Sequence, residues 1–421
     1  MTHFGILTPP VFGHLHPFGA LGRELQSRGH RVSVFHIPDL QEAVGSEGLS
    51  FVEIGRKDHP VGSLPRSWSE IGRLKGWPAL QFTLREIVSV TRTFCEEGPA
   101  AIRDAGVGCL LVDQTEPAGA AMADYLGIPF VSICNALIMN RGSEIPPPFA
   151  GWSYRTDWFG KLRNRGGYWL WDWVTRPVLF EARRYQEKWG QRPFRSAEDT
   201  FSPLAQISQQ PEAFDYPRRK LPSRFHYVGP LRRPKAGPDP FPWDRLDGRP
   251  IIYASLGTLQ GAKIDLFQVI AEACQDLPVQ LVMSHGRSLS EDQVRALPGN
   301  PLVVPYAPQW QLLGRTRLTV THAGLNTVLD SLAHGVPLVA IPITYEQPAI
   351  AARIRWARVG QIVPLSKIRA SVLRQSISQV LQEPKYQETA KHMAEAIRQS
   401  GGVVRAADII ESLPLDPDNL K

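Results

Sequence analysis

Cysteine is scarce in this chain, and long apolar runs are missing. The 421 residues include four cysteines without paired or metal-ligand spacing: Cys95, Cys109, Cys134 and Cys274. Isolated cysteines are typical of buried thiols in a reducing compartment, so a disulfide framework and a zinc site are not expected. The N-terminus has no cationic region before an apolar one, and Tyr168–Phe180 is too short to cross a bilayer. We therefore expect a cytoplasmic protein without a signal peptide.

A strong excess of one charge is also missing. With 47 Lys and Arg against 40 Asp and Glu, the net charge is +7. This mild excess favours anionic small molecules or an anionic membrane surface, and no base-reading motif accompanies it, so nucleic acid is not an expected partner. The apolar content of 43% and charged content of 21% are typical of a globular protein, and the length suits two domains.

Short apolar runs alternate with helix-like segments. A strand at Phe4–Thr8, a helix from Pro17 to Gly29 and a strand at Arg31–Ile37 form a first unit. Similar units recur at 109–134, 251–284 and 317–342. Strand–helix–strand units of this kind indicate α/β domains in which helices cover both faces of a parallel sheet.

Two segments interrupt this alternation. One, at 146–195, is rich in tryptophan, arginine and proline, and the other, at 221–250, is rich in proline. We therefore predict two doubly wound domains, at 1–220 and 251–400, with 221–250 as an irregular linker. Substrates are expected in the cleft between the domains, because parallel sheets bind ligands at the carboxyl ends of their strands.

The run Thr321–Thr327 follows an expected strand and opens an expected helix. Free backbone N–H groups and the helix dipole make such an N-terminus a phosphate site. The run contains a glycine that permits close approach and three donor side chains: Gly324, His322, Asn326 and Thr327. Asp330, one turn after Asn326, can accept hydrogen bonds from ribose hydroxyls. The alternative is a satisfied core histidine beside an ordinary helix cap.

Several runs resemble the donor-binding signature of the UDP-dependent glycosyltransferases, a family that includes plant secondary-product, antibiotic-tailoring and carotenoid enzymes. In the C-terminal half these runs are Tyr306–Gln309, Thr321–Thr327, Gly335–Pro337 and Glu346–Gln347. Further matching runs are 111–119, 202–208, 225–229 and 254–261. The resemblance, which covers most of the chain, implies two facing Rossmann-like domains (GT-B), with the C-terminal segment 401–421 crossing back to the N-terminal domain.

The same resemblance assigns parts of a nucleotide diphosphate-sugar, with UDP and glucose expected, to single residues. His322 would contact the diphosphate, Asn326 and Thr327 its oxygens, and Asp330 the ribose, where many relatives have glutamate. Tyr306 stands where plant relatives often stack a tryptophan on uracil. Sugar hydroxyls would be bound by Glu346 and Gln347. Further donor-site positions are Gln309 and the turn residues Ser255, Gly257 and Thr258, which follow a strand.

The N-terminal half supplies the expected chemistry. A sugar acceptor hydroxyl is a poor nucleophile, and a neutral imidazole can take its proton. His14 lies in the expected loop after the first strand, and Asp113 ends another strand of the same sheet, where a buried carboxylate would fix the histidine tautomer. By position the family's catalytic pair falls on these two residues. His16 is a rival, and a loop histidine and a helix-capping aspartate are the alternatives.

The implied reaction inverts the anomeric carbon: the acceptor oxygen attacks it while the nucleotide diphosphate leaves from the opposite face. Charge on the leaving group would be met by His322, backbone N–H groups and the helix dipole. No cofactor or metal is expected. Asp416 and Asp418 have the spacing of metal-dependent transferases of another fold, but their polar, proline-containing tail is typical of a solvated terminus.

The segment 149–185 combines aromatic with basic side chains. The aromatic residues are Phe149, Trp152, Tyr154, Trp158, Phe159, Tyr168, Trp169, Trp171 and Trp173, and the basic residues are Arg155, Lys161, Arg163, Arg165 and Arg176. This mixture suits the surface of an anionic membrane that holds a lipophilic acceptor, and it equally suits the core of an irregular lobe. The resemblance to carotenoid enzymes favours the membrane and a hydroxylated carotenoid as acceptor.

Three other functions are compatible with the sequence. A transferase for a soluble polyketide or phenolic acceptor would keep the same donor site. A nucleotide-sugar epimerase shares the two-domain architecture but would need no His–Asp pair on the acceptor side. A non-catalytic partner protein would bind the donor without turnover.

Overall fold

The first parallel sheet belongs to the N-terminal domain. The computed structural model describes residues 1–74, 76–233, 241–257 and 264–415. The sheet has the order β3-β2-β1-β4-β5-β6-β7, and every neighbouring pair is parallel. Its strands are β1 His3–Leu7, β2 Arg31–His36, β3 Ser50–Glu53, β4 Cys109–Asp113, β5 Phe130–Cys134, β6 Gln206–Ser208 and β7 Phe225–Tyr227.

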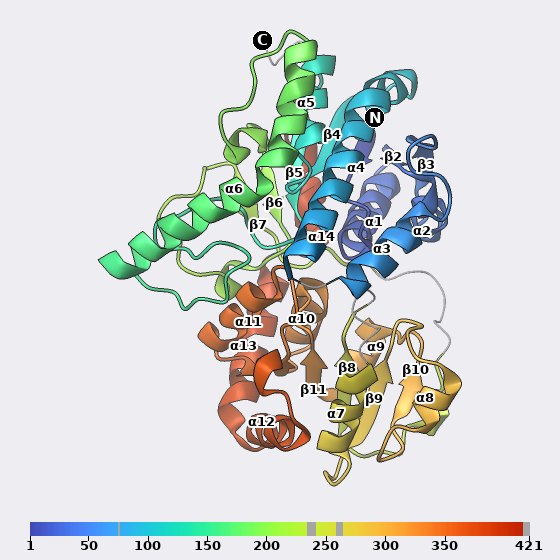
Figure 1. Ribbon diagram of the computed structural model, residues 1–421, viewed down its shortest axis with the longest axis vertical. Coiled ribbons are helices and arrows are strands. Elements are labelled where there is room, and N and C mark those ends of the chain that lie inside the picture. Colours follow the sequence, from blue (N-terminus) through green and yellow to red (C-terminus); the bar gives the residue numbers. More distant parts are fainter. Residues whose placement is uncertain (75, 234–240, 258–263, 416–421) are drawn as a thin grey trace.

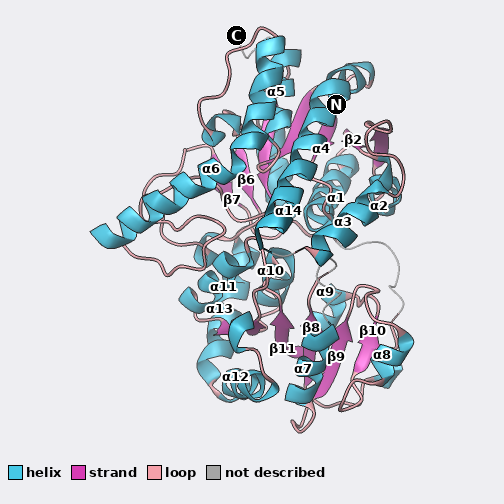
Figure 2. Cartoon of the chain, in the orientation of Figure 1, coloured by secondary structure: helices cyan, strands magenta, loops and turns pink. Residues whose placement is uncertain are grey.

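The second parallel sheet belongs to the C-terminal domain, below the first domain in Figure 1. Its order is β10-β9-β8-β11-β12-β13. Its strands are β8 Ile251–Ser255, β9 Gln280–Ser284, β10 Leu302–Val304, β11 Thr316–Thr321, β12 Leu338–Ala340 and β13 Gly360–Ile362. In both sheets the chain winds outward from the first strand in both directions, and helices cover the faces (Figure 2). This confirms the two Rossmann-like domains of a GT-B fold.

The helices of the N-terminal domain differ from expectation at one functional point. They are α1 Phe12–Ser27, α2 Gln41–Ser46, α3 Ser63–Arg73, α4 Gly76–Asp104, α5 Pro117–Leu126 and α6 Trp158–Lys188. The prediction that the first helix starts at Pro17 was wrong, because α1 begins at Phe12 and Pro17 lies inside it. His14 therefore lies in the first helical turn instead of a loop, which fixes its backbone more firmly.

Both segments expected to be irregular contain regular structure. The 31-residue helix α6 occupies most of the tryptophan-rich segment and projects from the N-terminal domain (Figure 1). Most of its large apolar residues between Trp158 and Phe180 face solvent, so apolar residues do not mark the buried face over this part of the helix. Strand β7 lies within 221–250 and pairs with β6 through Gln206↔Phe225, which places this part of the expected linker in the first sheet.

The C-terminal helix connects the two domains. The second domain carries α7 Ile264–Cys274, α8 Glu291–Arg295, α9 Gln309–Leu313, α10 Leu325–Ala333, α11 Gln347–Trp356, α12 Ala370–Gln382, α13 Pro384–Gln399 and α14 Gly402–Glu411. Arg28 at the end of α1 forms ion pairs with Asp408 and Glu411 of α14. Helix α14 thus crosses back to the N-terminal domain, as the resemblance implied.

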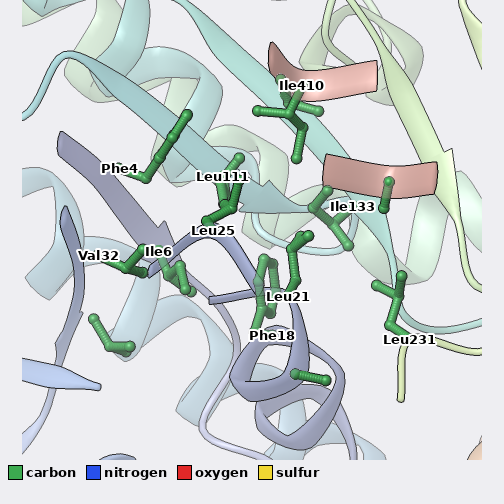
Figure 3. Packing of buried hydrophobic residues seen from close by; sticks show 14 of the residues in the cluster. Phe4, Ile6, Phe18, Leu21, Leu25, Val32, Leu111, Ile133, Leu231 and Ile410 are labelled. Atoms are coloured by element: carbon green, nitrogen blue, oxygen red, sulfur yellow. The ribbon is translucent and has the colours of Figure 1, made fainter. Parts of the chain in front are cut away.

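Apolar burial fixes this crossing. The main core of the N-terminal domain combines residues of β1, α1 and β4 with Val403, Ala406 and Ile410 of α14. Figure 3 shows Ile410 beside the strands that carry Leu111 and Ile133. Burying a side chain of this size stabilises the fold by roughly 1.5–3 kcal/mol. Within the described residues, no helix is long and apolar enough to cross a membrane, and no cluster of three metal-ligating side chains is found.

Candidate active site

The histidine and aspartate predicted as a pair lie in contact. Strands β1 and β4 are neighbours in register Leu7↔Val112, so the first turn of α1 and the end of β4 meet at one edge of the sheet. His14 Nδ1 lies 2.8 Å from Asp113 Oδ2, and the imidazole is 19% exposed while the carboxylate is fully buried. The orientation leaves Nε2 as the nitrogen that can accept a proton.

Asp113 is held on several sides. Its Oδ1 accepts hydrogen bonds from Thr115 N at 2.9 Å and Thr115 Oγ1 at 2.6 Å, and its Oδ2 accepts one from Asn135 Nδ2 at 3.0 Å. Burial alone would raise the pKa of Asp113, but His14 and Thr115 outweigh it and the pKa is lowered. Burial likewise opposes protonation of His14, yet the charge of Asp113 prevails and raises the pKa of the imidazole. The pair therefore combines an ionised aspartate with a more basic histidine.

The rival histidine has a different partner. His16 Nδ1 lies 2.8 Å from Glu47 Oε1, and its side chain is 55% exposed. It does not share the buried carboxylate of His14.

The predicted phosphate-binding turn lies between β11 and α10. His322 and Gly324 precede the helix, and Ala323 between them has a φ of 67°, a conformation costly for a residue with a side chain. A Cβ on Gly324 would lie 2.5 Å from His322 Nε2, and one on Gly257 would lie 2.8 Å from it. A side chain at Gly324 or Gly257 would therefore clash with the His322 ring. Burial lowers the pKa of His322 to about 4, so the ring is neutral near pH 7.

Contacts between the domains bring this turn to the His–Asp pair. Pro17 lies inside α1 and has no N–H, so it cannot donate a helical hydrogen bond to the Gly13 carbonyl. Asn326 Nδ2 of α10 donates to this carbonyl oxygen instead, at 2.7 Å. Asn326 Oδ1 in turn accepts from Gln209 Nε2 at 3.0 Å. Glu346 Oε2 accepts from the Leu137 N–H at 3.0 Å.

Glu346 also lies within electrostatic range of His14 and Asp113. Burial raises the pKa of this glutamate. His14, Asp113, Asn326 and Glu346 therefore form one polar site between the two sheets, although they are distant in sequence.

A second polar cluster surrounds Asp330. Its Oδ1 accepts from Arg232 Nε at 2.6 Å, and its Oδ2 accepts from Gln309 Nε2 at 2.7 Å. Thr327 Oγ1 lies 3.3 Å from the other amide atom of Gln309, its Oε1. Beside the cluster is a cavity of about 420 Å³, lined by Arg232, Gln309, Asp330 and Gly402 among others. Its volume falls within the range of small-molecule pockets.

The remaining predicted residues are less closely grouped. Tyr306 is half exposed, with the Arg287 guanidinium 5.5 Å from its ring centroid. Gln347 Oε1 accepts from the N–H groups of Ile343 and Thr344. Ser255 ends β8, and its Oγ accepts from Gly257 N at 3.4 Å. Thr258, Asp416 and Asp418 lie outside the described residues.

Sequence reasoning missed three residues of these clusters: Asn135, Gln209 and Arg232. Asn135 directly follows β5, and Gln209 directly follows β6, so the rule for carboxyl ends of parallel strands would have drawn attention to both. Arg232 lies in the segment treated as linker, and no sequence pattern connects it to Asp330.

Two Rossmann-like domains with a polar site between them and a helix N-terminus at that site are the arrangement of the GT-B fold. Residues 81–399 match the family model "UDP-glucoronosyl and UDP-glucosyl transferase". The chain belongs to this family and is a nucleotide-sugar glycosyltransferase.

Individual relatives extend over nearly the whole chain. The zeaxanthin glucosyltransferase of Pantoea ananas is 34% identical, over 98% of this chain and 96% of its own length. The zeaxanthin glucosyltransferase of Pseudescherichia vulneris is 34% identical over 98% of both chains. Among solved structures, the glycotransferase of kitacinnamycin is similar in fold, with a TM-score of 0.77 and 22% identity over 97% of this chain and 98% of that one.

Proposed function

We propose that this enzyme transfers glucose from UDP-glucose to a hydroxyl of a hydroxylated carotenoid such as zeaxanthin, with inversion at the anomeric carbon. The proposed chemistry rests on one observation: the buried Asp113 Oδ2 lies 2.8 Å from His14 Nδ1, and this pair lies beside Asn326 and Glu346 of the C-terminal domain. The acceptor is supported by the 34% identity to two zeaxanthin glucosyltransferases over nearly their full length.

In the proposed reaction His14 acts as general base. Its Nε2 takes the acceptor proton while the acceptor oxygen forms a bond to the anomeric carbon. The bond from that carbon to the diphosphate oxygen breaks, and UDP leaves with the electron pair from the opposite face. Asp113 holds the Nδ1–H tautomer and stabilises the imidazolium that forms. An α-linked donor therefore yields a β-glucoside.

The donor would lie along the start of α10. The N–H groups at this helix N-terminus, together with His322 and Thr327, would bind the diphosphate and the negative charge that develops on it. Asp330 would accept hydrogen bonds from the ribose hydroxyls. Glu346 and Gln347 would form hydrogen bonds with the sugar hydroxyls. Tyr306 offers a half-exposed ring for the uracil.

The outward face of α6 supports collection of the acceptor from a membrane. Aromatic and aliphatic residues recur on it at spacings of four and seven, which keeps them on one side of a helix: Trp158, Leu162, Trp169, Trp173 and Phe180. All five are more than half exposed. The buried face of α6 carries Gly160, Asn164 and Gly167 in its first half, and Val178, Ala182 and Tyr185 in its second half. A helix that turns its largest apolar side chains to solvent has the polarity expected for contact with lipid.

Basic residues make the same face suitable for anionic lipid. Arg165 and Arg176 are exposed and lie one turn before Trp169 and one turn after Trp173. Trp77 of α4 stacks on Trp173 at 5.8 Å and widens the aromatic surface. By contrast, Trp171 packs on Phe149 at 5.2 Å and Tyr168 is buried, so part of the aromatic segment serves the protein interior. We propose peripheral attachment to the cytoplasmic face of a membrane.

Substitution of Trp169 and Trp173 by serine should lower the partition coefficient onto anionic vesicles about 100-fold, because each indole contributes roughly 1.5 kcal/mol on burial. Cosedimentation with phosphatidylcholine vesicles containing phosphatidylglycerol measures this. Arg165→Gln with Arg176→Gln should weaken binding to these vesicles but leave binding to neutral vesicles unchanged. Tyr125→Ser, which alters an exposed ring on α5, is the matched control. Equal binding by the wild type and the tryptophan variant would refute the membrane contact.

Substrate identity is tested by incubating the enzyme with detergent-solubilised zeaxanthin, a soluble phenol, and UDP-, GDP- and dTDP-sugars. We expect mass spectrometry to show carotenoid glucosides with UDP-glucose, and the phenol to react at least ten times more slowly. A faster reaction with the phenol would favour a soluble acceptor. Interconversion of the UDP-sugar without acceptor would favour an epimerase, and donor binding without UDP release would favour a non-catalytic protein.

A further inference from the structure

Two adjacent arginines of the connecting segment bind opposite domains. Arg232 Nε donates to Asp330 of α10 at 2.6 Å. Arg233 Nη1 donates to Arg23 O at 2.9 Å and to Glu24 Oε2 at 2.7 Å, both on α1. Both arginines line the 420 Å³ cavity, but only Arg232 contacts the carboxylate expected to hold ribose.

The Asp330 carboxylate retains accepting capacity on each oxygen. Ionised, it offers about four lone-pair sites. Arg232 occupies one lone-pair site on Oδ1, and Gln309 occupies one on Oδ2. One accepting site therefore remains on each oxygen. Two oxygens of one carboxylate are suitably spaced for a vicinal diol, which is the 2′,3′-diol of a ribonucleotide.

The two bonds also fix the plane of the carboxylate. Asp330 is 6% exposed, so its carboxylate has little contact with bulk water outside the cavity. A charge-assisted bond on one oxygen and an amide bond on the other oppose rotation of the group. A bound 2′-deoxyribonucleotide would leave one buried lone pair without a donor, which is costly.

We propose that Arg232 is a positioning residue that makes the donor site select ribonucleotides over 2′-deoxyribonucleotides, through the orientation of Asp330. The inference rests on the proposed function, in which Asp330 binds the ribose. Without Arg232 the carboxylate rotates, the second hydroxyl loses its aligned acceptor, and the discrimination falls.

Calorimetric titration of the intact enzyme with UDP and with dUDP tests this. The wild type should bind UDP roughly 30-fold more tightly than dUDP, in keeping with one hydrogen bond to a charged group. In Arg232→Met the ratio should fall below about threefold, chiefly through weaker UDP binding. Arg232→Lys, which keeps the charge without the planar fork, should give an intermediate ratio.

Arg233→Met is the matched control, because it alters the same cavity without touching Asp330, and it should keep the wild-type ratio. An unchanged ratio in Arg232→Met and Arg232→Lys, or equal weakening of both nucleotides, overturns the inference. Binding of neither nucleotide by the wild type would instead contradict the proposed donor site, so the two failures are distinguishable.

Discussion

Replacement of His14 by alanine is expected to lower kcat/KM for glucosyl transfer about 1,000-fold while the affinity for UDP changes less than about threefold. The acceptor hydroxyl loses the proposed base that takes its proton, whereas the proposed diphosphate contacts come from the other domain. Release of UDP in the presence of acceptor measures the rate, and calorimetry measures UDP binding. This separation of rate from affinity distinguishes a base from a residue that only supports the fold.

His16→Ala is the control for this experiment, because His16 lies two residues away in the same helix and pairs with Glu47. We expect its rate to stay within about threefold of the wild type. If His14→Ala kept more than one tenth of the activity, His14 would not be the general base of the transfer.

The pH dependence follows from the same pair. The Asp113 charge outweighs burial and raises the pKa of His14 above its ordinary value of 6.5. Because the base must be neutral, kcat/KM should rise with pH through this raised pKa and level off above it. In Asp113→Asn the effect of burial, which lowers the pKa of His14, is opposed only by the charge of Glu346, so the midpoint should move to lower pH. The plateau value of kcat/KM at high pH should also fall at least about 100-fold, because the Nδ1–H tautomer of His14 is no longer held.

Much of this site follows from local sequence rules. Parallel strands end at one edge of a sheet, so His14 after β1 and Asp113 at the end of β4 were expected to meet, and they lie 2.8 Å apart. The turn before α10 was recognisable because a glycine, a histidine and an asparagine at a strand–helix junction are suited to bind phosphate.

The parts that could not be predicted depend on contacts between distant residues. Because α1 starts before Pro17, the Gly13 carbonyl has no helical hydrogen-bond donor. Its donor is Asn326, which belongs to the other domain. Helix α6 departs from the polarity on which helix prediction relies, since large apolar residues such as Trp158, Trp169 and Trp173 face outward. Arg232 reaches Asp330 only through the path of the connecting segment.

Removal of the Asp215 carboxylate should have the largest effect on stability. Its Oδ1 accepts from Arg353 Nε and Nη2, both at 3.1 Å, and its Oδ2 accepts from Tyr227 and pairs with Arg218. Burial would raise the pKa of Asp215, but the two arginines outweigh it and the pKa is lowered. Asp215→Ala leaves two buried guanidinium groups without their counter-ion, which should reduce the free energy of unfolding by about 3–5 kcal/mol.

The urea midpoint, followed through tryptophan fluorescence, measures this loss. Asp247→Ala breaks an aspartate–arginine pair of similar geometry on the surface and should leave the midpoint nearly unchanged, because exposed pairs contribute little. A shift for Asp215→Ala no larger than this control would show that the buried pair does not stabilise the fold. Arg353→Met should be milder, because Asp215 keeps Arg218 and Tyr227 while an apolar side chain replaces the charge.

The position of this ion pair connects stability with catalysis. Asp215 belongs to the N-terminal domain, whereas Arg353 lies on α11, the helix that begins immediately after Glu346. The start of α11, where we propose that the sugar binds, is therefore connected to the N-terminal domain by two contacts, Asp215–Arg353 and Leu137–Glu346. Arg353→Met at a temperature where it stays folded should raise the KM for UDP-glucose several-fold with a smaller change in kcat, because Glu346 is then held beside His14 by the Leu137 N–H alone. An unchanged KM would confine the role of the buried pair to stability.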